Sequence, residues 1–149
     1  MEKRDKRIVF LIAVVAVGLG HFFKLDYSKI AESGLTLSSI VLAVYIAAII
    51  GLINSELAAK MKKEVSVSRP DKTQLGQLTT YFKHAVLCSI GTIVVSSLVL
   101  LISEPEEVTA FYTTIYYWIS IVGLVLYTEN IAFLSMTIRF MLNRQIWDT

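Results

Sequence analysis

The sequence predicts an all-α, polytopic membrane protein with four transmembrane helices. Of its 149 residues, 55% are hydrophobic, and the mean hydropathy is +0.64. A soluble domain of this size buries too little of its surface to hide so many apolar side chains. Uncharged apolar stretches of membrane-crossing length recur along the chain, and the lysines and arginines gather on alternate connections between them.

The four predicted spans belong to one domain, residues 1–149, and cover about residues 8–25, 35–55, 83–102 and 108–138. A helix needs about 17 to 25 apolar residues to cross a hydrocarbon core of about 30 Å. The first stretch is short and follows a basic segment, which is also typical of a secretory signal peptide. No small-x-small cleavage site follows it, because His21, Phe22 and Phe23 occupy that region. We therefore expect a retained signal anchor.

The basic residues predict the orientation. Four precede the first span, six lie at positions 60–83, between the apolar parts of the second and third, and Arg139 and Arg144 follow the main apolar part of the fourth. The first outer connection contains only Lys24 and Lys29. The positive-inside rule then places both termini and the loop 56–82 in the cytoplasm, in a bacterial-type inner membrane.

The two outer connections are short. Residues 24–34 are expected to form a brief helical turn, capped by Asp26 and ended at Ser33 and Gly34. In the second connection, Ser103 and Glu106 fit a capping box that starts the fourth helix. A cation-collecting mouth is the alternative for this acidic segment.

The second and fourth helices are expected to extend into the cytoplasm. Leu57, Met61 and Val65 recur every four residues, which predicts that the second helix continues for about three turns until Pro70 breaks it. This region has five basic residues that we expect to dock an acidic cytosolic protein or anionic membrane lipid. They are Lys60, Lys62, Lys63, Arg69 and Lys72. The orientation of the chain alone would also require many of them.

Small residues recur every fourth position in the second span. The row consists of Ser39, Ala43, Ala47, Gly51 and Ser55. Because lipid provides no hydrophobic drive between helices, small residues that allow close backbone approach mark helix contacts. The row drifts by about 40° at each step of four residues, so it can meet more than one partner. The contact lies either within one four-helix bundle or between subunits of a homo-oligomer.

Polar residues in the last two spans are candidates for a pore or gate. Ser89, Thr92 and Ser96 share one face of the third span, which indicates either helix packing or a water-lined path. Glu129 and Asn130 interrupt the fourth span. An ionisable residue inside a membrane is costly and by default a functional candidate, although Glu129 would also suit a structural ion pair near the inner headgroups.

We expect no enzyme, cofactor or metal site. No HExxH, GxSxG or glycine-rich phosphate loop occurs, and no nucleophile is paired with a base. Cys88 is the only cysteine, and His21 and His84 are predicted on opposite sides of the membrane, which excludes a shared metal site within one subunit. The motifs of other small four-span families, such as paired cysteines or a glutamate in the first span, are absent.

The predicted function is that of a small membrane subunit that forms a homo-oligomer in lipid and docks a cytosolic protein. The same layout fits a membrane-perturbing effector of the antiviral defence type. An ion channel or transporter, with a path lined by the third and fourth spans, is the alternative. We expect no nucleic-acid partner.

Overall fold

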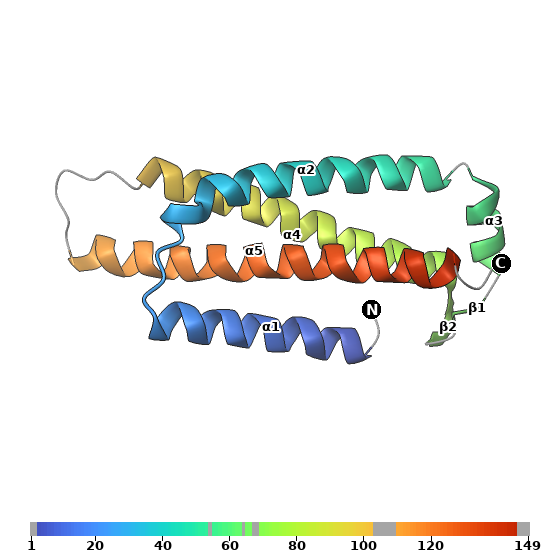
Figure 1. Cartoon of the computed structure of the whole chain (residues 1–149), viewed down its shortest axis with the longest axis horizontal. Coiled ribbons are helices and arrows are strands. Elements are labelled where there is room, and N and C mark those ends of the chain that lie inside the picture. The colour runs from blue at the N-terminus through green and yellow to red at the C-terminus, as the bar shows by residue number, and fades with distance from the viewer. Residues whose placement is uncertain (1–2, 54, 64, 67–68, 103–109, 146–149) are drawn as a thin grey trace.

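The computed structural model describes residues 3–53, 55–63, 65–66, 69–102 and 110–145 (Figure 1). The helices are α1 Lys3–Phe22, α2 Ser28–Ile53, α3 Glu56–Lys63, α4 Gln74–Ile102 and α5 Ala110–Gln145. Two short antiparallel strands, β1 Val65–Ser66 and β2 Arg69–Thr73, lie between α3 and α4. The prediction of a helical protein is confirmed, with this small hairpin as an addition.

Three helical segments are long and apolar enough to cross a membrane. They are Ser28–Ile53, Gln74–Ile102 and Thr113–Arg139. Helix α1 has 20 residues, but the first five are charged, so its apolar stretch is shorter. The chain is therefore compatible with a membrane protein, and four crossings remain a prediction.

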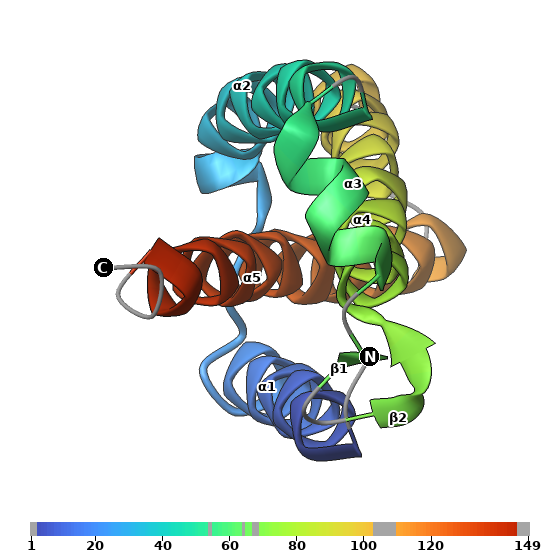
Figure 2. The ribbon, with the colours of Figure 1, turned by 90° about the vertical axis from the view of Figure 1, so that its right-hand side faces the viewer.

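Helix α4 lies at the centre of the packing. It packs along both α2 and α5, whereas α1 packs mainly on α5. The end-on view shows α2 and α1 on opposite sides of α5, with α4 beside both α2 and α5 (Figure 2). Helix α1 is thus an outer layer on a three-helix bundle.

Aromatic side chains fill the core near α3. Tyr45 of α2 and Phe82 of α4 meet edge to face, with their ring centroids 5.7 Å apart. Met61 of α3 is buried in the same cluster, together with Phe133 of α5. This cluster attaches α3 to the end of the bundle, because apolar side chains from four helices bury each other there.

The second helix is not continuous with the cytoplasmic segment, so the predicted extension of that helix is wrong. Helix α2 ends at Ile53, and α3 turns across the end of the bundle (Figure 1). The Ser55 hydroxyl donates a hydrogen bond to the Leu52 carbonyl at 2.8 Å and accepts one from the Ala58 amide at 3.2 Å. Ser55 therefore closes one helix and caps the next.

Helix α5 is a single helix of 36 residues, longer than the predicted fourth span. At 1.5 Å per residue it measures about 54 Å, which exceeds a hydrocarbon core of about 30 Å. Its location relative to a membrane remains a prediction. The predicted capping box at Ser103 and Glu106 lies outside the described residues.

The connection between α1 and α2 also differs from the prediction. Lys24 adopts a left-handed backbone conformation with φ of 48°, and the Leu25 amide bonds to the Gly20 carbonyl at 3.1 Å, which ends α1. Asp26 accepts a hydrogen bond from the Ser28 amide at 3.0 Å. The expected stop at Ser33 and Gly34 is wrong, because α2 runs through both.

Candidate functional site

A buried hydrogen-bonded chain joins the three central helices. The Asn130 side chain on α5 is 1% exposed and donates from Nδ2 to the Ser38 hydroxyl of α2 at 2.8 Å. The Ser89 hydroxyl of α4 donates to Asn130 Oδ1 at 3.0 Å. Interhelical hydrogen bonds of this kind hold helices together where lipid supplies no hydrophobic drive. Asn130 and Ser89 therefore join helices in this structure.

The other hydroxyls of the predicted polar face are buried as well. Thr92 Oγ1 donates to the Cys88 carbonyl at 2.8 Å, and Ser96 Oγ shares a hydrogen bond with the Tyr27 hydroxyl at 2.8 Å. The three hydroxyl residues predicted to share a face of α4 do share one, and this face is directed at α2, α5 and the loop before α2. Of the two alternatives, this geometry favours packing over a water-lined path.

Tyr27 is a key residue that the sequence reasoning missed. Its hydroxyl lies so close to Gly34, and its ring so close to Gly123, that a Cβ at either position would overlap the side chain. Its backbone amide donates to the Ser120 hydroxyl at 3.3 Å. The two glycines in otherwise bulky helices were the available signal, since glycine permits another group to approach the backbone closely.

Glu129 lies apart from these hydroxyls, in a groove between α1, α4 and α5. The groove has a volume of about 570 Å³, and its polar lining comes from Lys6, His84, Cys88 and Glu129. Its other lining residues are apolar: Val9, Phe10, Ala13, Leu87, Leu126 and Phe133. The structure therefore separates Glu129 from Asn130, although the two are adjacent in sequence.

The groove residues have defined contacts. The Cys88 thiol donates to the Leu126 carbonyl at 3.4 Å and lies 3.9 Å from Glu129 Oε2. His84 stacks on Phe133, with ring centroids 6.2 Å apart. A carboxylate, an imidazole and an ammonium group on one groove can bind small ions or exchange protons. Among the described residues, no three histidine, cysteine or acidic side chains gather as a metal site requires.

Helix α1 borders the groove and is attached near both of its ends. Asp5, near its start, accepts a hydrogen bond from the Tyr81 hydroxyl of α4. His21, near its end, hydrogen-bonds through Nδ1 to the Tyr117 hydroxyl of α5. These two polar contacts fix the position of α1 along the bundle. His21 contacts Tyr117 and His84 stacks on Phe133, so the two histidines contact different residues of α5.

The small-residue row of α2 faces outward. Ser39, Ala43, Ala47 and Gly51 are exposed, and a Cβ built on Gly51 would meet nothing within 4 Å. The buried residues of α2 are instead Ala31, Gly34, Ser38, Val41 and Tyr45. Packing of the row inside one bundle is therefore wrong for these four residues. Contact with another subunit remains a prediction.

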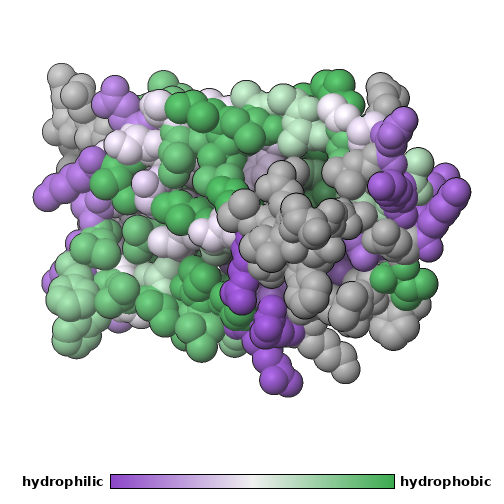
Figure 3. Space-filling view, turned by 45° about the vertical axis from the view of Figure 1, so that its right-hand side comes forward, coloured by the Kyte–Doolittle hydropathy of each residue, from purple (hydrophilic) through white to green (hydrophobic). Residues whose placement is uncertain are grey.

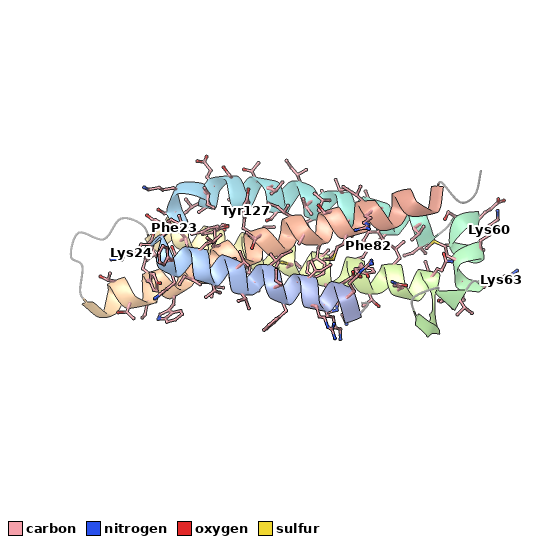
Figure 4. All side chains as sticks on the ribbon, turned by 60° about the horizontal axis from the view of Figure 1, so that its bottom comes forward. Phe23, Lys24, Lys60, Lys63, Phe82 and Tyr127 are labelled. Carbon is pink, nitrogen blue, oxygen red and sulfur yellow. The ribbon has the colours of Figure 1, made fainter. Side chains whose placement is uncertain are left out.

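The predicted docking lysines lie on α3. Lys60, Lys62 and Lys63 are exposed, and Figure 4 shows Lys60 and Lys63 at the opposite end of the molecule from Lys24. Arg69 and Lys72 belong to β2, and their side chains lie outside the described part. Many large apolar side chains of the described helices are exposed, and the face drawn in Figure 3 has wide apolar areas.

Comparison with protein-family models, with curated proteins and with solved structures gives no match to this chain.

Proposed function

We propose that the chain crosses an inner membrane four times, with α1 as an additional crossing helix and with both termini and α3 in the cytoplasm. Large apolar side chains of α1 are exposed, among them Phe10, Leu11 and Val14. Exposed apolar surface of this extent is unfavourable in water and favourable in lipid. The basic residues at the start of α1 can extend toward the headgroups, which supports a helix with a short apolar stretch as a span.

Within this membrane, we propose a subunit that docks a cytosolic protein on α3. One observation carries the proposal: α3 crosses the end of the bundle and is held there by the buried side chains of Ala58 and Met61. Its opposite face presents Lys60 and Lys63, which form no ion pair with the described part of the chain. A helix that packs on the end of the bundle and exposes lysines suits an acidic partner surface.

The test is the mass of the detergent-solubilised complex purified from its own cells. Neutralising the pair with Lys60→Gln and Lys63→Gln is expected to remove an acidic soluble protein from the complex. Lys24→Gln is the control, because Lys24 is also an exposed lysine but lies at the other end of the molecule. A complex that is unchanged by the α3 pair, or equally changed by Lys24→Gln, argues against docking on α3.

We also propose that the exposed row of α2 forms contacts between subunits. Small side chains on an exposed, otherwise apolar helix face permit close approach of a second helix. Ala47→Leu is expected to lower the subunit number in the same mass measurement. Ile46→Leu, a change of equal volume at an exposed neighbouring position, is expected to leave it unchanged.

A second candidate function is transport along the Glu129 groove. The observation in its favour is that Glu129 shares an apolar groove with Lys6 and His84. Purified protein in liposomes is then expected to carry cations or protons, and Glu129→Gln is expected to abolish this flux. Glu32→Gln, at an exposed position of α2, is the control. Equal flux through the wild type and the Glu129→Gln variant would contradict transport along this groove.

A further inference from the structure

A second cavity lies at the α3 end of the bundle. It has a volume of about 670 Å³ and lies between the end of α2, α3 and the start of α4. Most of its lining residues are apolar, among them Leu52, Phe82 and Val86. Pockets that bind small molecules typically span about 300 to 1,000 Å³ and are mainly apolar. This cavity has both properties.

The cavity offers two cationic groups and no hydroxyl that is free to donate. Ser55 donates to the Leu52 carbonyl, and Thr79 donates to the Leu75 carbonyl, each at 2.8 Å. Lys62 of α3 and Lys83 of α4 are exposed at the cavity. None of its lining residues is acidic, and neither lysine has an ion pair with the described residues. The charge of the cavity therefore selects an anionic ligand.

The position of the cavity identifies the kind of anion. Ile53 and Leu87 line it and are also 67% and 57% exposed, so the apolar lining continues onto the outer faces of α2 and α4. Both of these helices are long and apolar enough to cross a membrane. A ligand in this cavity must match apolar surface on the membrane side and two ammonium groups beside it.

We propose that the cavity binds an anionic phospholipid, with one acyl chain against Leu52, Phe82 and Val86 and the phosphate between Lys62 and Lys83. The proposal rests on the proposed membrane insertion and is independent of partner docking, which uses Lys60 and Lys63. An acidic peptide would match the two lysines but would leave the apolar lining without an apolar partner. A phospholipid matches both parts at once.

The test is a lipid titration followed by native mass spectrometry of the full chain in detergent. Phosphatidylglycerol with palmitoyl and oleoyl chains is compared with phosphatidylcholine that has the same chains. Each lysine near an anionic lipid headgroup contributes roughly a fivefold change in affinity. The double variant Lys62→Gln and Lys83→Gln is therefore expected to weaken phosphatidylglycerol binding by on the order of 20-fold.

The matched control is Lys60→Gln with Lys63→Gln. It removes the same charge from the same end of the bundle, but neither residue lines the cavity. It is expected to change lipid affinity by less than about twofold. This pair also separates the two proposals, because it tests partner docking while leaving the lipid site in place.

A third variant tests the apolar half of the site. Ala59 is exposed and lines the cavity, so Ala59→Phe fills it without changing charge. Binding of phosphatidylglycerol is expected to fall, with helix content and elution volume unchanged. The proposal is overturned by equal binding of phosphatidylcholine, by equal effects of the two lysine pairs, or by full binding to Ala59→Phe.

Discussion

At the residue scale, Tyr27 organises one end of the bundle. It precedes α2, yet its ring lies against Gly123 of α5 and its hydroxyl bonds to Ser96 of α4. Gly34 of α2 admits the hydroxyl end of the same side chain. One aromatic residue thus fills the gap between three helices, and each glycine has a packing reason.

Gly123→Ala is expected to destabilise the protein. The added Cβ would lie 2.6 Å from Tyr27 Cε1, so the ring or α5 must move. Overpacking of this kind costs typically about 1 to 3 kcal/mol. Gly18→Ala is the control, because a Cβ there would meet nothing within 4 Å, and alanine favours a helix. Unfolding in a denaturing detergent measures both variants, and equal stability of the two contradicts the packing of Tyr27.

Asn130→Leu tests the hydrogen-bonded chain. The substitution leaves the buried hydroxyls of Ser38 and Ser89 without their Asn130 partner, at a cost of about 1 to 3 kcal/mol per buried group. Adding Ser38→Ala and Ser89→Ala removes these orphaned groups, so the triple variant is expected to recover part of the stability. A triple variant that is less stable than Asn130→Leu would show that the three residues do not act as one unit.

Asp26 is expected to contribute a pH-dependent stability. Although burial raises its pKa, hydrogen bonds from Ser28 and from the Tyr116 hydroxyl outweigh burial and lower the pKa from its ordinary value of 3.8. The contribution is therefore present above that ordinary pKa and is lost as the pH falls through the lowered value. Melting of the wild type and Asp26→Asn should differ at neutral pH and converge in acid below the lowered pKa of Asp26; a constant difference contradicts this role.

At the element scale, the helical class and three of the four predicted apolar spans could be read from the sequence more readily than the faces of the helices. The polar face of α4 was predicted from the spacing of Ser89, Thr92 and Ser96, and it is a single buried face. The row of α2 has equally regular spacing but faces outward. The spacing of residues along a helix shows which of them share a face. The neighbouring helices determine which face is buried. In a helix that is apolar on all sides, the sequence gives little contrast to decide it.

The break between α2 and α3 was missed for a related reason. Leu57, Met61 and Val65 fit a continuous helix, and the same spacing also fits a new helix that begins at Glu56. Ser55 directly before Glu56 was the available signal, because serine is a favoured N-cap and an acidic residue suits the first turn. The groove around Glu129 was not predictable at all, since it depends on how α1 lies against α4 and α5.

Ser55→Ala is expected to loosen α3 with little effect on the rest of the bundle. An N-cap of this kind typically contributes about 1 kcal/mol to stability, and its loss removes the hydrogen bond from the Ala58 amide to the Ser55 hydroxyl. Hydrogen exchange should then become faster in α3, relative to α4. Ser39→Ala is the control, because that hydroxyl only bonds back to the Leu35 carbonyl of its own helix. Unchanged exchange in α3 would argue that the buried side chains of Ala58 and Met61 hold it without the cap.

At the scale of the whole molecule, exposed lysines lie at both ends of the long axis, and apolar helices lie between them. Lys60 and Lys63 lie at one end, and Lys24 lies at the other (Figure 4). Three long apolar helices connect the ends, and α1 lies along the same axis (Figure 1). This arrangement is the basis for the proposed orientation, the α3 docking surface and the lipid cavity.

The orientation is tested most directly by labelling single cysteines with a membrane-impermeant maleimide. Cys88 is buried and is first replaced by alanine. Cysteines are then introduced separately by Arg7→Cys, Lys24→Cys and Lys63→Cys, all at exposed positions. Four crossings predict that intact spheroplasts label only Lys24→Cys, and that Arg7→Cys and Lys63→Cys react only after permeabilisation. Labelling of Lys24→Cys and Lys63→Cys from the same side would contradict the proposed membrane insertion.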